Sequence, residues 1–307
     1  MDEACYNILL QLRLPDIHLI SLEAFESDDM ELLNSKQNRS LLEYYFTCTP
    51  SLPLFILDRN PAVDVITYLD ADLFFFQDPQ PIYAEMGDSS IAIIEHRFPP
   101  HLADRIQYGI YNVGWLSFRR DNSALTCLHW WRERCLEYCH DVAQDGRFAD
   151  QKYLDDWPKL FQKVVVLQHK GANLAPWNLA NYHLQTHDHH LWVDEQLLIF
   201  FHFHGLRRIA DWLYDPNLSG YGVKLSKVVR HSIFEPYLQA MLLVSKQLEC
   251  AVKVTSLPRG AKGPATHPSH QFSNSPRYII SKTRGIMQIG KALLTRQYIF
   301  VLGGHTI

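Results

Sequence analysis

The sequence lacks any apolar run long enough to cross a membrane. Its longest apolar stretches, such as 197–203, are far shorter than the roughly 20 residues that a membrane-spanning helix needs. No apolar segment of signal-peptide type opens the chain. Hydrophobic residues make up 47% and charged residues 20% of the 307 positions, which excludes wholesale disorder and allows a large core. We therefore expect a folded cytoplasmic protein.

The cysteines are scattered and do not indicate a disulfide scaffold or a zinc site. The six cysteines, at positions 5, 48, 127, 135, 139 and 250, lack the short paired spacings of a disulfide scaffold or a zinc site. Cys135 and Cys139 lie one helical turn apart, but a zinc site would need a second such pair. We interpret them as packing residues of a helix and expect reduced thiols.

Acidic residues are absent after Glu249. The tail beyond it carries eight lysines and arginines, so the chain's net charge of −4 divides into −12 for the body and +8 for the tail. We expect a globular domain over 1–250 and a basic extension over 251–307, with a Pro/Gly/Ser/His-rich linker at 256–276. A helix at 278–301 would either lie on an anionic membrane surface or pack on the body. Nucleic-acid binding is not expected, because the body offers no basic aromatic platform.

Short apolar strands alternate with helices along the body, which predicts an α/β sheet. Ser40 followed by Glu43 predicts a capping box, whereas Pro50 and Pro53 predict a break or kink. The expected helices cover 3–12, 40–57 and 125–139, and the expected strands cover 16–22, 63–69, 90–94, 113–118, 164–167 and 197–203.

Two aspartates follow the apolar strand at 63–69. Asp70 and Asp72, with only Ala71 between them, would stand at the carboxyl edge of the sheet, where open α/β folds bind ligands. A turn with two solvated carboxylates is one interpretation. A divalent cation is the other, since it would relieve the repulsion between two charges at an apolar strand end.

A second polar cluster ends the strand at 197–203. His202 and His204 lie two residues apart, on one face of a strand, and either could add a nitrogen ligand to the cation. Arg207 and Arg208 follow, and guanidinium groups suit phosphate oxygens. With sixteen histidines in the chain, a surface or core histidine is the alternative for each.

Two further motifs have both structural and functional interpretations. Asp150 could cap a helix, while Gln151 beside it projects into a cleft. Asn112 and Gly114 could form a turn, unless something needs close approach to the backbone there.

These motifs together resemble the metal-dependent glycosyltransferases of GT-A fold. The order that carries the resemblance is Asp70-x-Asp72, Asn112-x-Gly114, Asp150-Gln151, Trp177-Asn178 and His202-Phe-x-Gly205. It is similar to the family-8 retaining group, which includes glycogenin and lipopolysaccharide galactosyltransferases, and to bacterial glycosyltransferases of envelope polysaccharide clusters. The resemblance spans roughly residues 1–240 and implies a Rossmann-like mixed sheet flanked by helices.

The resemblance implies a role for each matching residue. Asp72 and His202, with Asp70, would bind Mn²⁺ or Mg²⁺, and Asp70 would also contact the donor; His204 is the less favoured ligand. The donor, a nucleoside-diphosphate sugar such as a UDP-sugar, would pass its sugar to a glycan or lipid-linked acceptor. Other residues would line the donor pocket (Asn112, Gly114), hold donor-sugar hydroxyls (Asp150), stand near the anomeric carbon (Gln151) and contact the diphosphate (Arg207, Arg208).

One departure from the pattern concerns the first strand and helix of such folds, which wrap the nucleotide base. Met1–Tyr6 corresponds to the helix after the second strand, so the first strand–helix unit is expected to be missing. The alternative is then a non-catalytic remnant that acts as a binding or assembly subunit. A haloacid-dehalogenase-like phosphatase is a further alternative, but Phe74 stands where that class has Thr or Val.

Overall fold

The computed structural model describes residues 1–252, 297–302 and 305–306, and the chain divides into two compact units. The first unit contains residues 1–19, 206–219 and the described residues from 224 onward. The second contains 20–205 together with 220–223. The expected boundary between 250 and 251 stays a prediction, because most of the basic extension lies outside the described residues.

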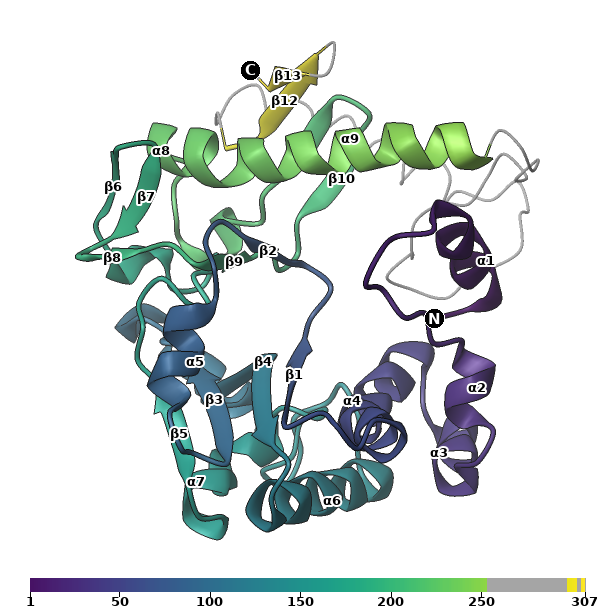
Figure 1. Cartoon of the computed structure of the whole chain (residues 1–307). Helices are drawn as coiled ribbons and strands as arrows, with labels where there is room; N and C mark the ends of the chain where they lie inside the picture. The colour runs from purple at the N-terminus through teal and green to yellow at the C-terminus, as the bar shows by residue number, and fades with distance from the viewer. Residues whose placement is uncertain (253–296, 303–304, 307) are drawn as a thin grey trace, which may run out of the picture. The chain divides into compact units, whose positions relative to one another are not determined.

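The second unit is built on a mixed four-stranded sheet with the order β1-β4-β3-β5 (Figure 1). Strand β4 is antiparallel to both of its neighbours, whereas β3 and β5 are parallel. The strands are β1 (Val65–Leu69), β3 (Ile91–Glu95), β4 (Tyr111–Arg119) and β5 (Val164–Leu167). The expected α/β sheet is confirmed, with these four strands within two residues of their predicted limits.

Both faces of this sheet are covered. Ile91 and Ile93 of β3 pack on one face, in a cluster with Trp131 of α6 (Asn122–Glu137). Ala92 and Ile94 point to the opposite face, where Ile82 of α5 (Gln80–Met86) covers them. Successive side chains of a strand alternate between faces, so a strand covered on both faces reads as a continuous apolar run.

Helix α4 (Leu41–Arg59) begins with the predicted capping box. The Ser40 amide donates to the Glu43 carboxylate over 2.7 Å, and the Glu43 amide donates to the Ser40 hydroxyl over 3.3 Å. The predicted break is wrong, since the helix runs through Pro50 and Pro53. Both prolines are buried and α4 packs along α6, so tertiary packing outweighs the lost amide hydrogen bonds.

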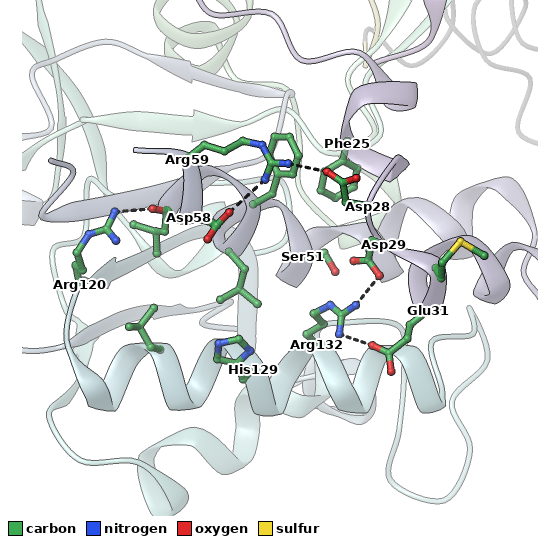
Figure 2. Close-up of a pocket in the computed structure, with 15 residues that line it drawn as sticks. Phe25, Asp28, Asp29, Glu31, Ser51, Asp58, Arg59, Arg120, His129 and Arg132 are labelled. Atoms are coloured by element: carbon green, nitrogen blue, oxygen red, sulfur yellow. Dashed lines mark hydrogen bonds and ion pairs between the residues drawn. The ribbon is translucent and has the colours of Figure 1, made fainter. Parts of the chain in front are cut away.

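Ion pairs join the segment that contains α2 (Leu22–Glu26) and α3 (Met30–Ser35) to α4 and α6 (Figure 2). Arg132 of α6 contacts Asp29 at 2.7 Å and Glu31 at 2.9 Å. Arg59 of α4 contacts Asp28 at 3.3 Å. These groups, with Ser51, line a cavity of about 710 Å³.

Two predicted strands differ from the structure. Residues 16–22 form no strand, because Ile17 is exposed and Ser21 instead caps α2. The run 197–203 divides between two small sheets outside the main one. The first pairs β9 (Phe200–His202) with β2 (Leu73–Phe75), and the second contains β6 (Leu184–His187), β7 (His190–Val193) and β8 (Gln196–Leu197). Helix α7 (Trp157–Leu160) and the 3₁₀ segments Lys36–Asn38, Pro100–Tyr108, Lys152–Asp156 and Leu179–Asn181 complete this unit.

The first unit pairs helices with a separate sheet. Helix α1 (Glu3–Leu12), as predicted, contacts α9 (Glu235–Val252). The sheet has the order β10-β11-β12-β13, and its β12 (Ile299–Leu302) corrects the end of the helix predicted over 278–301. Residues 278–296 of that helix lie outside the described residues. The remaining strands are β10 (Arg207–Ala210), β11 (Leu213–Asp215) and β13 (His305–Thr306). The remaining helical segments are α8 (Lys227–Val229), the π-helical turn Arg230–Phe234 and the 3₁₀ turn Ser219–Tyr221. Part of this 3₁₀ turn belongs to the second unit.

A helix that spans a membrane needs roughly 20 apolar residues. Within the described part of the chain, no helix has both the length and the apolar character of a membrane span.

Candidate functional site

The acidic pair lies where β1 leaves the main sheet. The Asp70 amide donates to the Gly114 carbonyl at 3.2 Å, and the Tyr68 hydroxyl donates to Asp70 Oδ1 at 3.0 Å. Directly after Asp72 the chain enters β2, whose Leu73 lies opposite His202 of β9. The antiparallel β2–β9 ladder therefore brings together two motifs that are far apart in the sequence.

Asp72, His202 and His204 form a group of potential metal ligands. One ligand atom from each lies within 4.8 Å of the others. His202 Nε2 is 3.0 Å from Asp72 Oδ1 and 3.8 Å from Asp70 Oδ2. Ligand atoms on adjacent corners of an octahedral site are about 3 Å apart when the bonds are about 2.1 Å, so the Asp72–His202 spacing fits a divalent ion. His204, the less favoured residue in the sequence, joins this group.

The two carboxyl groups occupy different electrostatic environments. Burial raises the pKa of Asp70 above its ordinary value, against the opposing effect of His202, and the charge of Asp72 raises it further. Burial also acts on Asp72, but the hydrogen bond and charge of His202, with His204, outweigh it and lower its pKa. Asp72 is therefore the carboxylate that is held ionised beside the imidazoles.

Gly114 allows close approach at the start of β4. A β-carbon at this position would lie 2.6 Å from Asn112 Oδ1 and 2.8 Å from His202 Nδ1, both shorter than real contacts. The Gly114 amide donates to Asn112 Oδ1 at 3.1 Å, and His202 Nδ1 lies 3.3 Å from the same oxygen. A glycine is therefore needed at this position, because the His202 ring packs directly against the backbone of the strand. Of the two interpretations made from the sequence, close approach to the backbone is the one that the structure supports.

Asp150 is buried at the end of an irregular segment. Its carbonyl accepts a hydrogen bond from the Trp131 indole at 2.8 Å. Burial raises the pKa of its carboxyl group to about 7, with a contribution from the Asp70 charge, while a hydrogen bond with Thr49 opposes the rise. The helix-cap interpretation is wrong, because the 3₁₀ turn begins at Lys152 and places Gln151 at the cap position, without a side-chain cap.

One cavity connects these residues. Its volume is about 990 Å³, at the upper end of the range for small-molecule sites. Helix α4 and the segment 142–148 supply apolar lining through Leu42, Tyr45 and Phe148. The polar lining contains most of the residues predicted from the sequence, namely Asp70, Asp72, Asn112, Asp150, Gln151, His202 and His204.

His96 and Trp177 line the same cavity without having been assigned a role from the sequence. His96 directly follows β3, is buried, and stacks on Phe98 with ring centroids 4.6 Å apart. The position of His96 directly after an apolar strand could have marked it as a candidate site residue, because Asp70 follows β1 in the same way. The Trp177 ring contacts His202 edge-on at 5.0 Å. Asn178 is buried and donates to the His96 carbonyl, which holds this loop.

Arg207 and Arg208 belong to the first unit and are not among the residues that line the cavity. Arg207 contacts Asp215 at 2.8 Å, and Arg208 contacts Asp211 at 3.0 Å. Their contact with a diphosphate stays a prediction.

Comparison with known proteins places the chain among bacterial relatives. No family model matches the sequence. The chain is 34% identical over 218 residues to the uncharacterized protein YfnF of Bacillus subtilis (strain 168), covering 68% of this chain and 71% of YfnF. It is 30% identical over 241 residues to the uncharacterized protein YfnD of the same organism, covering 78% of this chain and 76% of YfnD. The chain belongs to the family of YfnF and YfnD.

A solved structure also resembles this member of the YfnF and YfnD family. It is a glycosyltransferase involved in the glycosylation of the major capsid of PBCV-1, and the match covers 61% of this chain and 90% of that chain. The sequence identity is 10% and the TM-score is 0.36, a value too low to establish a common fold.

Proposed function

We propose that the chain is a metal-dependent glycosyltransferase of GT-A type, which moves a sugar from a nucleoside-diphosphate donor, such as a UDP-sugar, to a hydroxyl group of a glycan or glycolipid. The observation that carries this proposal is the approach of His202 Nε2 to Asp72 Oδ1 at 3.0 Å, with His204 beside them, in the wall of the 990 Å³ cavity. A carboxylate and imidazoles form a donor set suited to Mn²⁺ and related divalent ions.

The residues of the cavity would divide the chemistry among them. Asp72 and His202 would hold Mn²⁺ or Mg²⁺, which when bound neutralises the charge that grows on a leaving diphosphate. Asp70, oriented by the Tyr68 hydroxyl, would contact the ion or the donor. Asp150, whose pKa is raised to about 7, could both donate and accept hydrogen bonds with donor-sugar hydroxyls.

Gln151 bears on the stereochemistry. Its side-chain amide donates to the Tyr108 carbonyl at 3.0 Å, and an amide is neither an ionised base nor a strong nucleophile. Transfer would then retain the configuration of the sugar through attack on the face from which the diphosphate departs. Arg207 or Arg208 would assist the leaving diphosphate.

The basic extension supports a location of the protein on the inner face of a membrane. Its eight positive charges, with no acidic residue among them, would attract an anionic lipid surface that carries a lipid-linked acceptor.

The test is a panel of sugar nucleotides with Mn²⁺, in which release of the nucleoside diphosphate is measured for the wild type and for Asp72→Asn. We expect at least a 100-fold loss of turnover in Asp72→Asn, because the charge of an ion ligand is removed. Asp88→Asn is a matched control, since Asp88 is exposed and does not line the cavity. Equal turnover in wild type and Asp72→Asn would contradict the metal site. If the wild type shows no metal-dependent affinity for UDP, the result would favour the alternative of a non-catalytic remnant that acts as a binding or assembly subunit.

A further inference from the structure

Asn112 is the centre of a hydrogen-bond network within the cavity wall. Its Oδ1 lies 3.1 Å from the Gly114 amide nitrogen and 3.3 Å from His202 Nδ1. Its Nδ2 lies 3.4 Å from both His96 Nε2 and Gln151 Oε1. An asparagine side chain can accept two hydrogen bonds and donate two, so all four positions of Asn112 are taken by the protein.

Three backbone groups determine the direction of every hydrogen bond in this network. The Gly114 amide can only donate, so the oxygen of Asn112 must face it. The Tyr108 carbonyl can only accept, so the Gln151 amide nitrogen faces Tyr108 and its oxygen faces Asn112. The Ile110 carbonyl, 3.1 Å from His96 Nδ1, places the ring hydrogen on that atom and leaves Nε2 as the acceptor.

The network reaches the candidate metal site at His202. Since Nδ1 of His202 faces the acceptor oxygen of Asn112, that nitrogen carries a hydrogen. In the neutral ring the lone pair then lies on Nε2, which faces Asp72 Oδ1 at 3.0 Å. When Nε2 also carries a proton, it donates that proton to Asp72, and a bound metal ion would take the place of that proton between the same two atoms.

We propose that His96 and Asn112 are positioning residues, which hold His202 with its hydrogen on Nδ1 and so direct Nε2 toward the cation. The same amide of Asn112 also orients Gln151. This inference rests on the metal site of the proposed function. It replaces donor binding as the role of Asn112, because the four hydrogen-bonding positions of that side chain are already in use.

Packing leaves the network little freedom to rearrange. His96 is buried between Phe98, at 4.6 Å, and Trp177, at 5.2 Å between ring centroids. Trp177 also contacts the ring of His202, and the backbone of Gly114 closes the other side. Partners that orient a ligand in this way typically change metal affinity 10–100-fold when they are removed.

The first experiment measures binding of Mn²⁺ alone by quenching of tryptophan fluorescence, because Trp177 lies beside His202. His96→Phe keeps an aromatic ring on Phe98 but removes both nitrogens, and we expect it to weaken Mn²⁺ binding 10–100-fold. His129→Phe is the matched control, since His129 is exposed on α6 and should leave Mn²⁺ affinity unchanged.

A second pair of variants separates positioning from simple packing. Asn112→Asp keeps an acceptor oxygen for Gly114 and His202 but loses the amide hydrogens that face His96 and Gln151, so its Mn²⁺ affinity should lie between those of the wild type and Asn112→Leu. Asn112→Leu removes that oxygen and should weaken binding at least tenfold. If Asn112 only fills space, the buried charge of Asn112→Asp should be at least as harmful as Asn112→Leu, which would overturn the proposal.

Long-range ¹H–¹⁵N NMR spectra of the metal-free protein provide a readout independent of the metal. We expect a hydrogen on His202 Nδ1 that exchanges slowly in the wild type and rapidly in His96→Phe and Asn112→Leu. A bare Nδ1 in the wild type would overturn the proposal, as would unchanged Mn²⁺ affinity in both variants. Absence of Mn²⁺ binding in the wild type, together with the expected spectra, would instead remove the metal site and leave the positioning role supported.

Discussion

At the scale of single residues, Asp150 shows a conflict between stability and chemistry. Its carboxyl group is buried and its pKa in the folded protein is raised from 3.8 to about 7. Because the folded state holds the proton more tightly than the unfolded state, the contribution to stability is greatest below pH 3.8. It is lost as the pH rises through about 7. Above pH 7 the buried carboxylate of Asp150 therefore destabilises the folded state.

Asp150→Asn should therefore stabilise the fold while removing activity. We expect the free energy of unfolding at pH 8 to rise by about 1–4 kcal/mol, because a neutral amide of the same size replaces a buried carboxylate. The gain should shrink toward zero at pH 2.5, where the aspartate is largely protonated in both states. Urea unfolding at the two pH values measures the difference, with release of the nucleoside diphosphate followed in parallel. A loss of stability of Asp150→Asn at pH 8 would contradict the raised pKa of the Asp150 carboxyl group.

At the scale of elements, the start of α4 combines a helix cap with a tertiary contact. Burial opposes the ionisation of Glu43, but hydrogen bonds from the Ser40 and Asp141 amides and from His140 lower the pKa of its carboxyl group to about 2. The distances are 2.7 Å to Ser40 N, 3.1 Å to Asp141 N and 3.0 Å to His140 Nδ1. One carboxylate thus attaches the helix to the segment that leads into the cavity wall at 142–148.

Glu43→Gln should lower the free energy of unfolding by about 1–3 kcal/mol at pH 7. Because the folded pKa is depressed, the stabilisation is present above pH 4.5 and is lost as the pH falls toward 2. The variant and the wild type should then converge at low pH in chemical unfolding experiments. Glu23→Gln, at an exposed position in the first turn of α2, is the control and should behave as wild type. A penalty that does not depend on pH would exclude this electrostatic explanation.

Elements with local signals could be predicted from the sequence, whereas those that depend on distant partners could not. The capping box at Ser40 and Glu43 and the apolar strands of the main sheet follow from residues that are adjacent in the chain. Residues 16–22 have strand-like composition but no strand to pair with, and 197–203 pairs with β2 and β7 instead of the main sheet. Continuation of α4 through its prolines likewise depends on packing against α6.

The candidate site likewise has features that could be predicted from the sequence and features that could not. The proximity of Asp72 and His202 could be predicted because Asp72 follows one apolar strand and His202 ends another, and their side chains approach to 3.0 Å. The part played by His96 could not, because it depends on which nitrogen faces Ile110 and on the rotation of the Asn112 amide. Such hydrogen-bond directions are set by three-dimensional contacts, and no local pattern of residues encodes them.

At the scale of the whole molecule, the first unit gathers residues from both ends of the described chain. Its sheet pairs β11 with β12, more than 80 positions further along the chain, so that Leu213 lies opposite Phe300. Ile299 is fully buried, and Trp212 stacks on Phe300 with ring centroids 5.9 Å apart. Tyr298, Ile299 and Val301 are therefore part of the core of this unit.

Ile299→Ala should lower the stability of this sheet by about 2–5 kcal/mol, because it leaves a cavity in a buried position. Hydrogen exchange at the amides of Leu213–Asp215 should become correspondingly faster. Ile17→Ala is the matched control in the same unit, since Ile17 is 53% exposed and the substitution should change exchange little. Unchanged protection of β11 in Ile299→Ala would mean that β12 does not support it.

The ladder between β2 and β9 has a consequence for the unfolded chain as well as for the folded one. Asp72 and His202 are separated by 130 positions, and Leu73 lies opposite His202 in the ladder. A cation bound by both side chains would act as a cross-link that closes this long loop and reduces the entropy of any state in which the loop is open. Such an ion would therefore stabilise the folded state, and its removal would loosen the same two strands that bring its ligands together.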